Sequence, residues 1–232
     1  MALDEAVSNA VAGKLSFPTM RFYSWKPSAV SIGYFQSLEK EVRLHECEML
    51  GVDIVRRRTG GGAVYHDNAG EITYSVIAPE SFFPRDIIAS YKMICGWIVS
   101  AFALLGLKAE FKPINDIILN GKKVSGNAQT RRNGILLQHG TILYDLDVKK
   151  MFTVLNVGPE KIADKFIATV EERVTSVTKN SGVSKDEVYQ ALVSAFTKDK
   201  KWSFGKYSPM ETMEAEELAQ TRYSSKEWNF MR

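Results

Sequence analysis

The chain has 232 residues, of which 45% are hydrophobic and 25% are charged, the composition of an ordinary globular protein with enough length for a full core. Its net charge of +3 is too small to indicate a general nucleic-acid-binding surface. No apolar run has the length of a membrane span, and three histidines without clustered spacing argue against a structural zinc site. We therefore predict a cytoplasmic enzyme of one domain, residues 1–232, that binds neither nucleic acid nor a membrane.

The first half of the sequence predicts an alternation of helices and strands. In chain order, the patterns indicate a helix over residues 3–11, strands over 20–25 and 29–35, a helix over 38–50 and a strand over 52–57. Ile72, Tyr74 and Val76 then alternate with polar residues, as the side chains of a strand do.

The second half opens with the longest predicted helix, residues 85–105, whose apolar residues form one packing face. Asn120-Gly121 and Asn133-Gly134 are strong turn signals, so two successive hairpins are expected after it. A capping box at residues 184–187 starts a further helix, and a last helix is predicted over residues 211–219. These elements predict one domain of mixed α and β structure with much antiparallel pairing.

Residues 56–67 hold the most informative motif, in which three arginines are followed by Thr59 and three consecutive glycines. Glycine has no Cβ, so a ligand can lie against this backbone and meet its N–H groups. The arginines supply fixed positive charge that suits a phosphate or a carboxylate. We therefore predict that this segment binds an anionic ligand.

The first predicted hairpin carries a lysine that is a candidate for catalysis. If residues 120–121 form the turn, Asp116 lies opposite Ser125. Because side chains alternate along strands, Asp116 and Lys123 then share one face, where they place a carboxylate and an ammonium together. Lys122 falls on the other, mainly apolar face, so Lys123 is the better functional candidate.

The histidines and cysteines give no sign of a nucleophilic centre. His66 and His139 have no serine or cysteine partner at a recognisable spacing, so no nucleophilic triad is expected. Cys47 and Cys95 lie inside apolar helical patterns and are expected to be reduced core residues.

Three motifs together resemble those of the lipoate–protein ligases. Residues 56–67, Asn115-Asp116 and residues 123–128 match in order and spacing, and His139-Gly140 matches further downstream. The similarity covers nearly the whole chain. It implies an α+β fold, with a mixed, largely antiparallel sheet flanked by helices, like that of biotin–protein ligases and of the catalytic core of class II aminoacyl-tRNA synthetases.

The resemblance also implies an ATP-dependent lipoate–protein ligase that works in two steps. ATP and lipoate form lipoyl-adenylate, and the lipoyl group then passes to a lysine of a lipoyl-carrier domain, as in a 2-oxoacid dehydrogenase E2 or the glycine cleavage H protein. Lys123 is the implied catalytic residue, acting with Mg²⁺ on the phosphates, and Asp116 is implied to hold the metal or to orient Lys123. The residues implied to bind lipoate and ATP are Arg57, Gly60, Gly61, Gly62, Ala63, Val64, Tyr65, His66, Asn115, Asp116, Gly126, Ala128, His139 and Gly140.

Many lipoate ligases carry an additional small C-terminal domain, for which no room remains after residues 223–228. We therefore expect a separate small subunit to complete the adenylation step.

Two other functions stay open. An octanoyl- or lipoyl-transferase uses no ATP but needs a cysteine in its site, commonly near the lysine hairpin, where residues 111–116 contain none. The other is a non-catalytic binder of an acyl-adenylate, such as a sensor or an assembly partner. Lys123 and the arginine–glycine segment argue against it, because simple binding of lipoate needs no charge that clamps phosphates.

Overall fold

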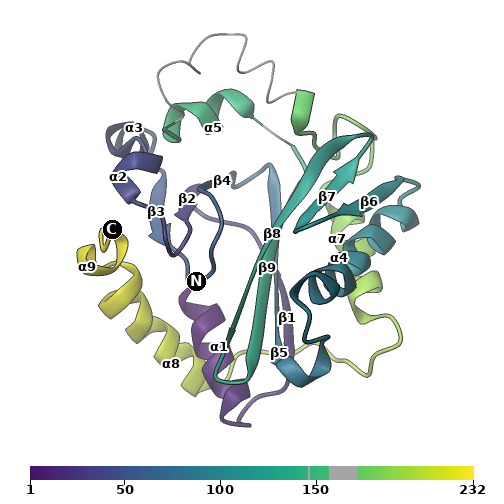
Figure 1. Ribbon diagram of the computed structural model, residues 1–232, viewed down its shortest axis with the longest axis horizontal. Coiled ribbons are helices and arrows are strands. Elements are labelled where there is room, and N and C mark those ends of the chain that lie inside the picture. Colours follow the sequence, from purple (N-terminus) through teal and green to yellow (C-terminus); the bar gives the residue numbers. More distant parts are fainter. Residues whose placement is uncertain (146, 157–171) are drawn as a thin grey trace.

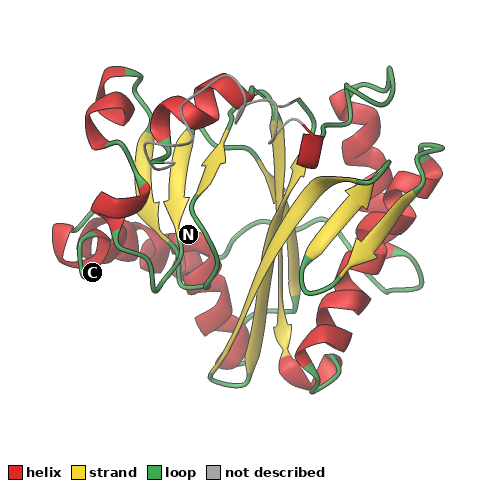
Figure 2. Ribbon diagram, turned by 45° about the horizontal axis from the view of Figure 1, so that its top comes forward, coloured by secondary structure: helices red, strands yellow, loops and turns green. Residues whose placement is uncertain are grey.

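The computed structural model describes residues 1–145, 147–156 and 172–232. These residues form a large and a small β-sheet, which lie side by side with helices around them (Figure 1, Figure 2). This agrees with the predicted α+β class, because most strand pairs are antiparallel and helices flank the sheets.

The large sheet has six strands in the order β1-β5-β9-β8-β7-β6, and every neighbouring pair is antiparallel. Its strands are β1 (Thr19–Tyr23), β5 (Glu71–Pro79), β6 (Ala109–Lys112), β7 (Asp116–Leu119), β8 (Lys122–Arg132) and β9 (Ile135–Leu143). Both predicted hairpins are present, since residues 120–121 join β7 to β8 and residues 133–134 join β8 to β9. The four turn residues have positive φ, as type I′ turns require.

The small sheet has three strands in the order β3-β2-β4. They are β2 (Ala29–Ile32), β3 (Asp53–Arg56) and β4 (Val64–His66), and β2 runs parallel to β3 but antiparallel to β4. The short helices beside this sheet are α2 (Leu38–Glu41), α3 (Leu44–Met49) and α5 (Val148–Val154). Apolar residues of these helices and of β2 form one buried cluster.

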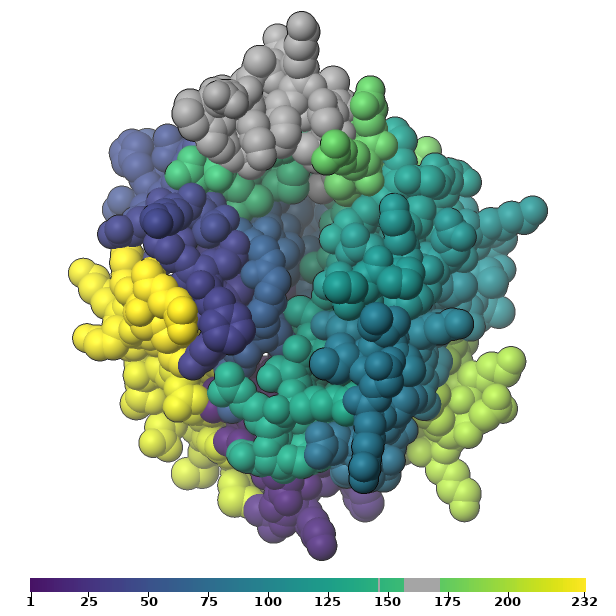
Figure 3. Space-filling model, viewed as in Figure 1, coloured from purple at the N-terminus to yellow at the C-terminus, as the bar shows by residue number. Residues whose placement is uncertain are grey.

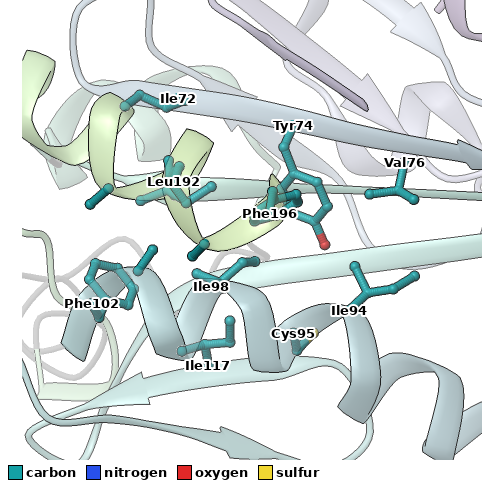
Figure 4. Close-up of a cluster of buried hydrophobic side chains, with 14 of the residues drawn as sticks. Ile72, Tyr74, Val76, Ile94, Cys95, Ile98, Phe102, Ile117, Leu192 and Phe196 are labelled. Carbon is teal, nitrogen blue, oxygen red and sulfur yellow. The ribbon is translucent and has the colours of Figure 1, made fainter. Parts of the chain in front are cut away.

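Helices cover both faces of the large sheet. They are α4 (Ile87–Leu104) and α7 (Lys185–Thr197) on one face, and α1 (Ala2–Ala12) and α8 (Pro209–Leu218) on the other. Successive residues of a strand point to opposite faces, so Tyr74 and Val76 pack with α4 and α7 (Figure 4), whereas Ile77 packs with α1. The remaining described turns of helix are a 3₁₀ turn (Glu80–Phe82), a π-helical turn (Ala219–Tyr223) and α9 (Lys226–Asn229).

Helix α4 is long and apolar enough to cross a membrane by length and composition alone. Its residues Tyr91, Ile94, Ile98 and Phe102 are buried in the main core cluster. The helix is thus the amphipathic packing helix that the sequence predicts.

Two expected elements differ in the structure because tertiary contacts override the local pattern. The single helix predicted over residues 38–50 is two helices, since Val42 has an extended backbone and forms an isolated bridge with Leu155. The strand predicted over residues 29–35 ends at Ile32, and the backbone N–H of Tyr34 donates to the carbonyl oxygen of Thr59. The chain after β2 thereby lies against the start of the glycine segment.

The lysine hairpin has a different register from the one expected. Ile118 pairs with Lys123, but Ile117 pairs with Ser125, so Val124 is an extra residue in β8. Such a β-bulge moves every later pair by one position. Asp116 therefore lies opposite Gly126 and not opposite Ser125.

Candidate functional site

A cavity of about 280 Å³ lies between the small sheet and strands β8 and β9. The molecular surface is hollowed between these segments (Figure 3). Predicted site residues that line the cavity are Arg57, Gly61, Gly62, Ala63, Val64, Tyr65, His66, Asn115, Lys123, Gly126, Ala128, His139 and Gly140. The fold thus brings Arg57 and Lys123, which are far apart in the sequence, to one cavity.

Two of the predicted residues lie just outside the lining: Asp116 contacts Lys123, and Gly60 contacts Arg57. Sequence reasoning did not assign several residues that do line the cavity, namely Met1, Tyr23, Trp25, Ser31, Thr73, Asn127, Thr141, Leu143, Met151, Leu155 and Val174. Asn127 lies within the recognised motif at residues 123–128. The others lie on strands, helices and loops that only the tertiary structure brings to the cavity.

Arg57 holds the glycine segment in place. Its Nη2 donates to the carbonyl oxygens of Gly60 (2.8 Å) and Gly62 (2.7 Å), and its Nη1 donates to the carbonyl oxygen (3.0 Å) and the Oγ (3.1 Å) of Ser31. Its Nε donates to Thr59 Oγ1 at 3.2 Å. All five N–H groups of the guanidinium are therefore used within the protein.

The charge of Arg57 is not neutralised by an ion pair with any carboxylate of the described residues. Burial lowers the pKa of Arg57 to about 10, so the guanidinium still carries its proton at neutral pH. Arg57 has no free N–H group for the expected bidentate grip on a ligand. It therefore acts on a ligand through the electric field of its charge.

The other two arginines of the motif also bind parts of the protein. Arg56 is fully buried and donates to backbone carbonyls. Arg58 Nη1 forms an ion pair with Glu5 Oε1 at 2.9 Å. The expectation that the three arginines together grip an anion is therefore not met by the geometry.

Gly61 and Gly62 differ in whether the structure can accept a side chain at their position. Gly61 has φ of +96°, and a Cβ there would lie 3.0 Å from Arg57 Nη2, whereas a Cβ on Gly62 would meet no atom within 4 Å. We expect Gly61→Ala to lower the free energy of unfolding by about 1–3 kcal/mol, because alanine disfavours this backbone conformation.

Gly62→Ala should leave the free energy of unfolding unchanged. It should raise the KM for the ligand that lies against this segment roughly tenfold or more, because the added methyl occupies space beside that ligand. Urea unfolding and steady-state kinetics measure the two effects. Gly182→Ala is the matched control, since a Cβ there also meets no atom and Gly182 does not line the cavity. A Gly62→Ala protein with the wild-type KM would show that no ligand lies against this backbone.

Lys123 lies over the backbone of Gly126 and contacts Asp116. The distance from Lys123 Nζ to Asp116 Oδ1 is 2.7 Å. A Cβ on Gly126 would come within 2.9 Å of Lys123 Cε and Nζ, so the missing side chain leaves the space that the ammonium occupies. The bulge in β8 creates this arrangement, because it places Gly126 opposite Asp116.

Asp116 was predicted either to hold magnesium or to orient Lys123, and its contacts bear on these two roles. Its Oδ1 is paired with the Lys123 ammonium, and the described residues contain no group of three or more His, Cys, Asp or Glu side chains arranged to hold a metal ion. Proteins usually hold magnesium by one or two carboxylates together with substrate phosphates and waters, so the metal role of Asp116 stays a prediction. The contact supports the other predicted role, in which Asp116 orients Lys123.

Asn115 and Asn127 hold the wall of the cavity together. The Nδ2 of each residue donates to the carbonyl oxygen of the other, and Asn127 Oδ1 accepts a hydrogen bond from Tyr74 Oη at 2.6 Å. Tyr74 is fully buried. The predicted binding residue Asn115 is therefore fixed to the core of the large sheet through Asn127.

The structure gives His66 partners that its sequence neighbourhood did not reveal. His66 Nε2 lies 2.8 Å from Ser31 Oγ, and His66 Nδ1 lies 2.8 Å from Glu71 Oε1. Ser31 is on β2 and His66 is on β4, so the antiparallel pairing of these strands brings the two residues together. The sequence showed no serine at a recognisable spacing from His66, and the structure supplies one because it brings Ser31 close in space.

His139 is a buried residue at the opposite wall. Its Nε2 lies 2.7 Å from Thr59 Oγ1, and its Nδ1 is 3.6 Å from Asp4 Oδ2. Burial lowers the pKa of His139, so its neutral form is favoured. Through its contact with Thr59, this histidine connects the glycine segment to β9.

Neither of the two cysteines lines the cavity. Both are buried and reduced, as the sequence predicts. Burial raises the pKa of Cys47 to about 11 and that of Cys95 to about 12. Because the thiolate is the nucleophilic form, these thiols are unreactive at neutral pH.

Comparisons with known proteins agree with the resemblance. The family model described as the lipoyl protein ligase A/B catalytic domain matches residues 1–197. The chain is 35% identical over all of its length to octanoyltransferase LipM of Brevibacillus brevis, of which it covers 94%. It is 36% identical over 99% of its length to octanoyltransferase LipM of Kyrpidia tusciae, of which it covers 93%.

Solved structures of lipoate protein ligases have the same fold as this chain. A bi-partite lipoate protein ligase from Thermoplasma acidophilum, studied with its E2 lipoyl domain, has a TM-score of 0.89 and 34% identity, covering 99% of this chain and 89% of that one. Lipoate-protein ligase A bound with ATP has a TM-score of 0.85 and 32% identity, covering 99% of this chain and 92% of that one.

The curated relatives correct the predicted activity. Those that match essentially the whole chain at 34% to 36% identity are named octanoyltransferases. A transferase moves an acyl group that is already activated, so its reaction needs neither ATP nor an acyl-adenylate. The prediction of an ATP-dependent lipoate–protein ligase is therefore wrong, and the relatives favour the transferase alternative. The structures described as ligases share the fold with this chain and do not by themselves distinguish the two reactions.

Proposed function

The chain belongs to the lipoyl protein ligase A/B catalytic-domain family, and we propose from this that it is an octanoyltransferase. It passes an octanoyl group from an activated donor to the ε-amine of a lysine on a lipoyl-carrier domain. The observation that carries the proposal is the similarity to octanoyltransferases along the entire chain. The similarity to a ligase studied with its E2 lipoyl domain supports the choice of acceptor.

The size and lining of the cavity support a medium-length acyl chain as the ligand. Ligand pockets usually enclose roughly 300–1,000 Å³, and the cavity of about 280 Å³ lies just below this range. Its apolar walls include Val64, Leu143, Met151, Leu155 and Val174. A lipoyl group has the same carbon chain with added sulfur atoms and is the second substrate that we propose.

Octanoyl transfer without ATP requires an acyl donor that already has a good leaving group. A thioester meets this requirement, because a thiolate is a good leaving group. When a nucleophile attacks the carbonyl carbon, negative charge builds on the carbonyl oxygen. Lys123 lines the cavity and is held by Asp116, and we assign it the stabilisation of this oxygen.

Transfer in the absence of ATP tests the proposal. We expect the purified protein, mixed with an octanoyl thioester and a lipoyl domain, to add one octanoyl group to the domain, as measured by intact mass. A lipoyl domain with its acceptor lysine replaced by arginine is the control and should stay unmodified. Modification that occurs only with free octanoate, ATP and Mg²⁺, and not with the thioester, would contradict the proposal.

Two expectations from the sequence analysis remain predictions. One is a separate small subunit, which was expected for an adenylation step that the proposed transfer does not use and which is proposed here only by similarity to a bi-partite ligase. The other is the cytoplasmic location. Repeating the transfer assay with and without a candidate subunit addresses the first.

A further inference from the structure

Two residues that line the cavity, Ser31 and His66, are joined in a row with Glu71, which lies behind His66. Deepening the proposed transferase function, on which this inference rests, we propose that Ser31, His66 and Glu71 form a nucleophilic triad. Ser31 holds the acyl group as an ester after it leaves the donor and before it reaches the acceptor lysine.

The geometry of the three residues is that of a nucleophile, a base and an orienting carboxylate. Ser31 Oγ lies 2.8 Å from His66 Nε2, and His66 Nδ1 lies 2.8 Å from Glu71 Oε1. Ser31 and His66 line the cavity. All three residues are buried, with 1%, 5% and 2% of their surfaces exposed, so water does not compete for these hydrogen bonds.

The surroundings of His66 fix its ring and its tautomer. Glu71 accepts from Nδ1–H, which leaves Nε2 free to accept the proton of Ser31. The Trp25 ring stacks on the imidazole, with centroids 4.3 Å apart and an interplanar angle of 19°. Thr73 accepts from Trp25 Nε1 at 2.9 Å and donates to Glu71 Oε1. The base is therefore held in the orientation that proton transfer needs.

Arg57 places a positive charge beside the Ser31 hydroxyl. Its Nη1 donates to Ser31 Oγ at 3.1 Å, and no carboxylate of the described residues forms an ion pair with it. A fixed positive charge beside a hydroxyl stabilises the negative charge that the oxygen gains when it loses its proton. A hydroxyl placed in this way is activated as a nucleophile.

Among the described residues that line the cavity there is no cysteine, because Cys47 and Cys95 lie elsewhere. Covalent catalysis divides one difficult transfer into two easier steps. The triad therefore provides what the cysteine of other acyltransferases would provide.

The proposed reaction balances in two steps. In the first step, His66 Nε2 takes the proton of Ser31 Oγ, the oxygen bonds to the carbonyl carbon, and the carbon–sulfur bond breaks. The departing thiolate takes the proton from His66, leaving octanoyl-Ser31 and a free thiol. In the second step, the acceptor amine bonds to the same carbon, the carbon–oxygen bond breaks, and His66 moves the amine proton to Ser31 Oγ. The products are an amide and the original serine.

Intact mass and peptide mapping of the protein after incubation with an octanoyl thioester, without a lipoyl domain, test the triad. We expect one octanoyl group on Ser31, which is removed when the lipoyl domain is added. Ser31→Ala should give no adduct, and its transfer rate should fall about 10³-fold or more. Ser31→Cys should give an adduct that neutral hydroxylamine removes, because a thioester is more reactive towards it than an ester.

Matched controls separate the chemistry from effects on folding. Ser75→Ala replaces another fully buried serine that does not line the cavity, and we expect it to keep both the adduct and the transfer rate. Cys47→Ala/Cys95→Ala should do the same. Glu71→Gln should slow adduct formation about 10²–10⁴-fold, because the amide no longer holds the required tautomer.

The outcomes distinguish this inference from the proposed function. If the wild-type protein transfers octanoate to the lipoyl domain and Ser31→Ala does so at the same rate, the triad is overturned and the transferase stands. An adduct on Lys123 or on a cysteine also overturns the triad. If the wild-type protein transfers nothing from the thioester, the proposed function falls and the triad falls with it.

Discussion

Replacing Lys123 by alanine is expected to lower kcat for octanoyl transfer by about 10²–10³-fold. The ammonium is held by Asp116 at 2.7 Å over the bare backbone of Gly126, at the wall of the cavity. In the proposed mechanism, removal of this charge leaves the carbonyl oxygen of the tetrahedral intermediate without the stabilisation that we assign to Lys123. Because the charge on that oxygen is larger in the transition state than in the bound substrate, kcat should fall more than KM rises.

The stability of Lys123→Ala should be close to that of the wild type. The side chains of Lys123 and Asp116 are 39% and 32% exposed, and an ion pair with that exposure contributes less than about 1 kcal/mol. Steady-state kinetics and urea unfolding of the same preparation measure both quantities. Lys122→Ala is the control, since Lys122 is the neighbouring residue of β8 and does not line the cavity. Wild-type turnover in Lys123→Ala would remove this residue from the mechanism.

Replacing Arg56 by alanine is expected to have the largest effect on stability. Arg56 has no exposed surface, and each nitrogen of its guanidinium donates to at least one backbone carbonyl. The acceptors are the carbonyl oxygens of Gly33 (3.1 Å), Tyr34 (3.1 Å), Gln36 (2.6 Å), Trp228 (2.9 Å) and Asn229 (2.7 Å). Alanine leaves these buried acceptors without donors, and each unsatisfied group costs about 1–3 kcal/mol. After local relaxation, we expect the free energy of unfolding to fall by at least about 3 kcal/mol.

Urea unfolding of Arg56→Ala measures this loss. Arg132→Ala is the control, because Arg132 is exposed and its described contact is with the Tyr34 ring, 5.2 Å from the ring centroid. Such an exposed contact contributes about 0.5–1 kcal/mol. Equal losses in the two variants would show that the buried hydrogen bonds of Arg56 add nothing to stability.

The three arginines show how far a sequence motif can be interpreted. The motif placed Arg56, Arg57 and Arg58 next to the glycines, and this proximity to the cavity was correct for Arg57. Their partners come from other parts of the chain, however: Arg56 binds the segment around α9, and Arg58 pairs with Glu5 of α1. A charged side chain near a glycine segment therefore indicates a site, but its hydrogen bonds show whether it meets a ligand or holds the protein together.

The predicted activity, ATP-dependent ligation of lipoate, was wrong. The reason is that ligases and transferases of the family share much of their chemistry. Ligases and transferases of this fold both need an apolar cavity and a positive charge near the acyl carbonyl. Lys123 and the glycine segment suit both reactions equally, so these motifs identified the family without identifying the reaction. The identity to octanoyltransferases over the whole chain supplied the distinction.

The sequence by itself determined the local structure and the family. Alternation of apolar residues, turn signals at residues 120–121 and 133–134, and the capping box at residues 184–187 act over a few neighbouring residues, so they can be read directly. The tertiary structure alone decided the bulge at Val124, which seats Lys123 over Gly126, and the contact between Ser31 and His66. Both depend on hydrogen bonds between strands, and the free energy of such pairing comes from residues that are distant along the chain.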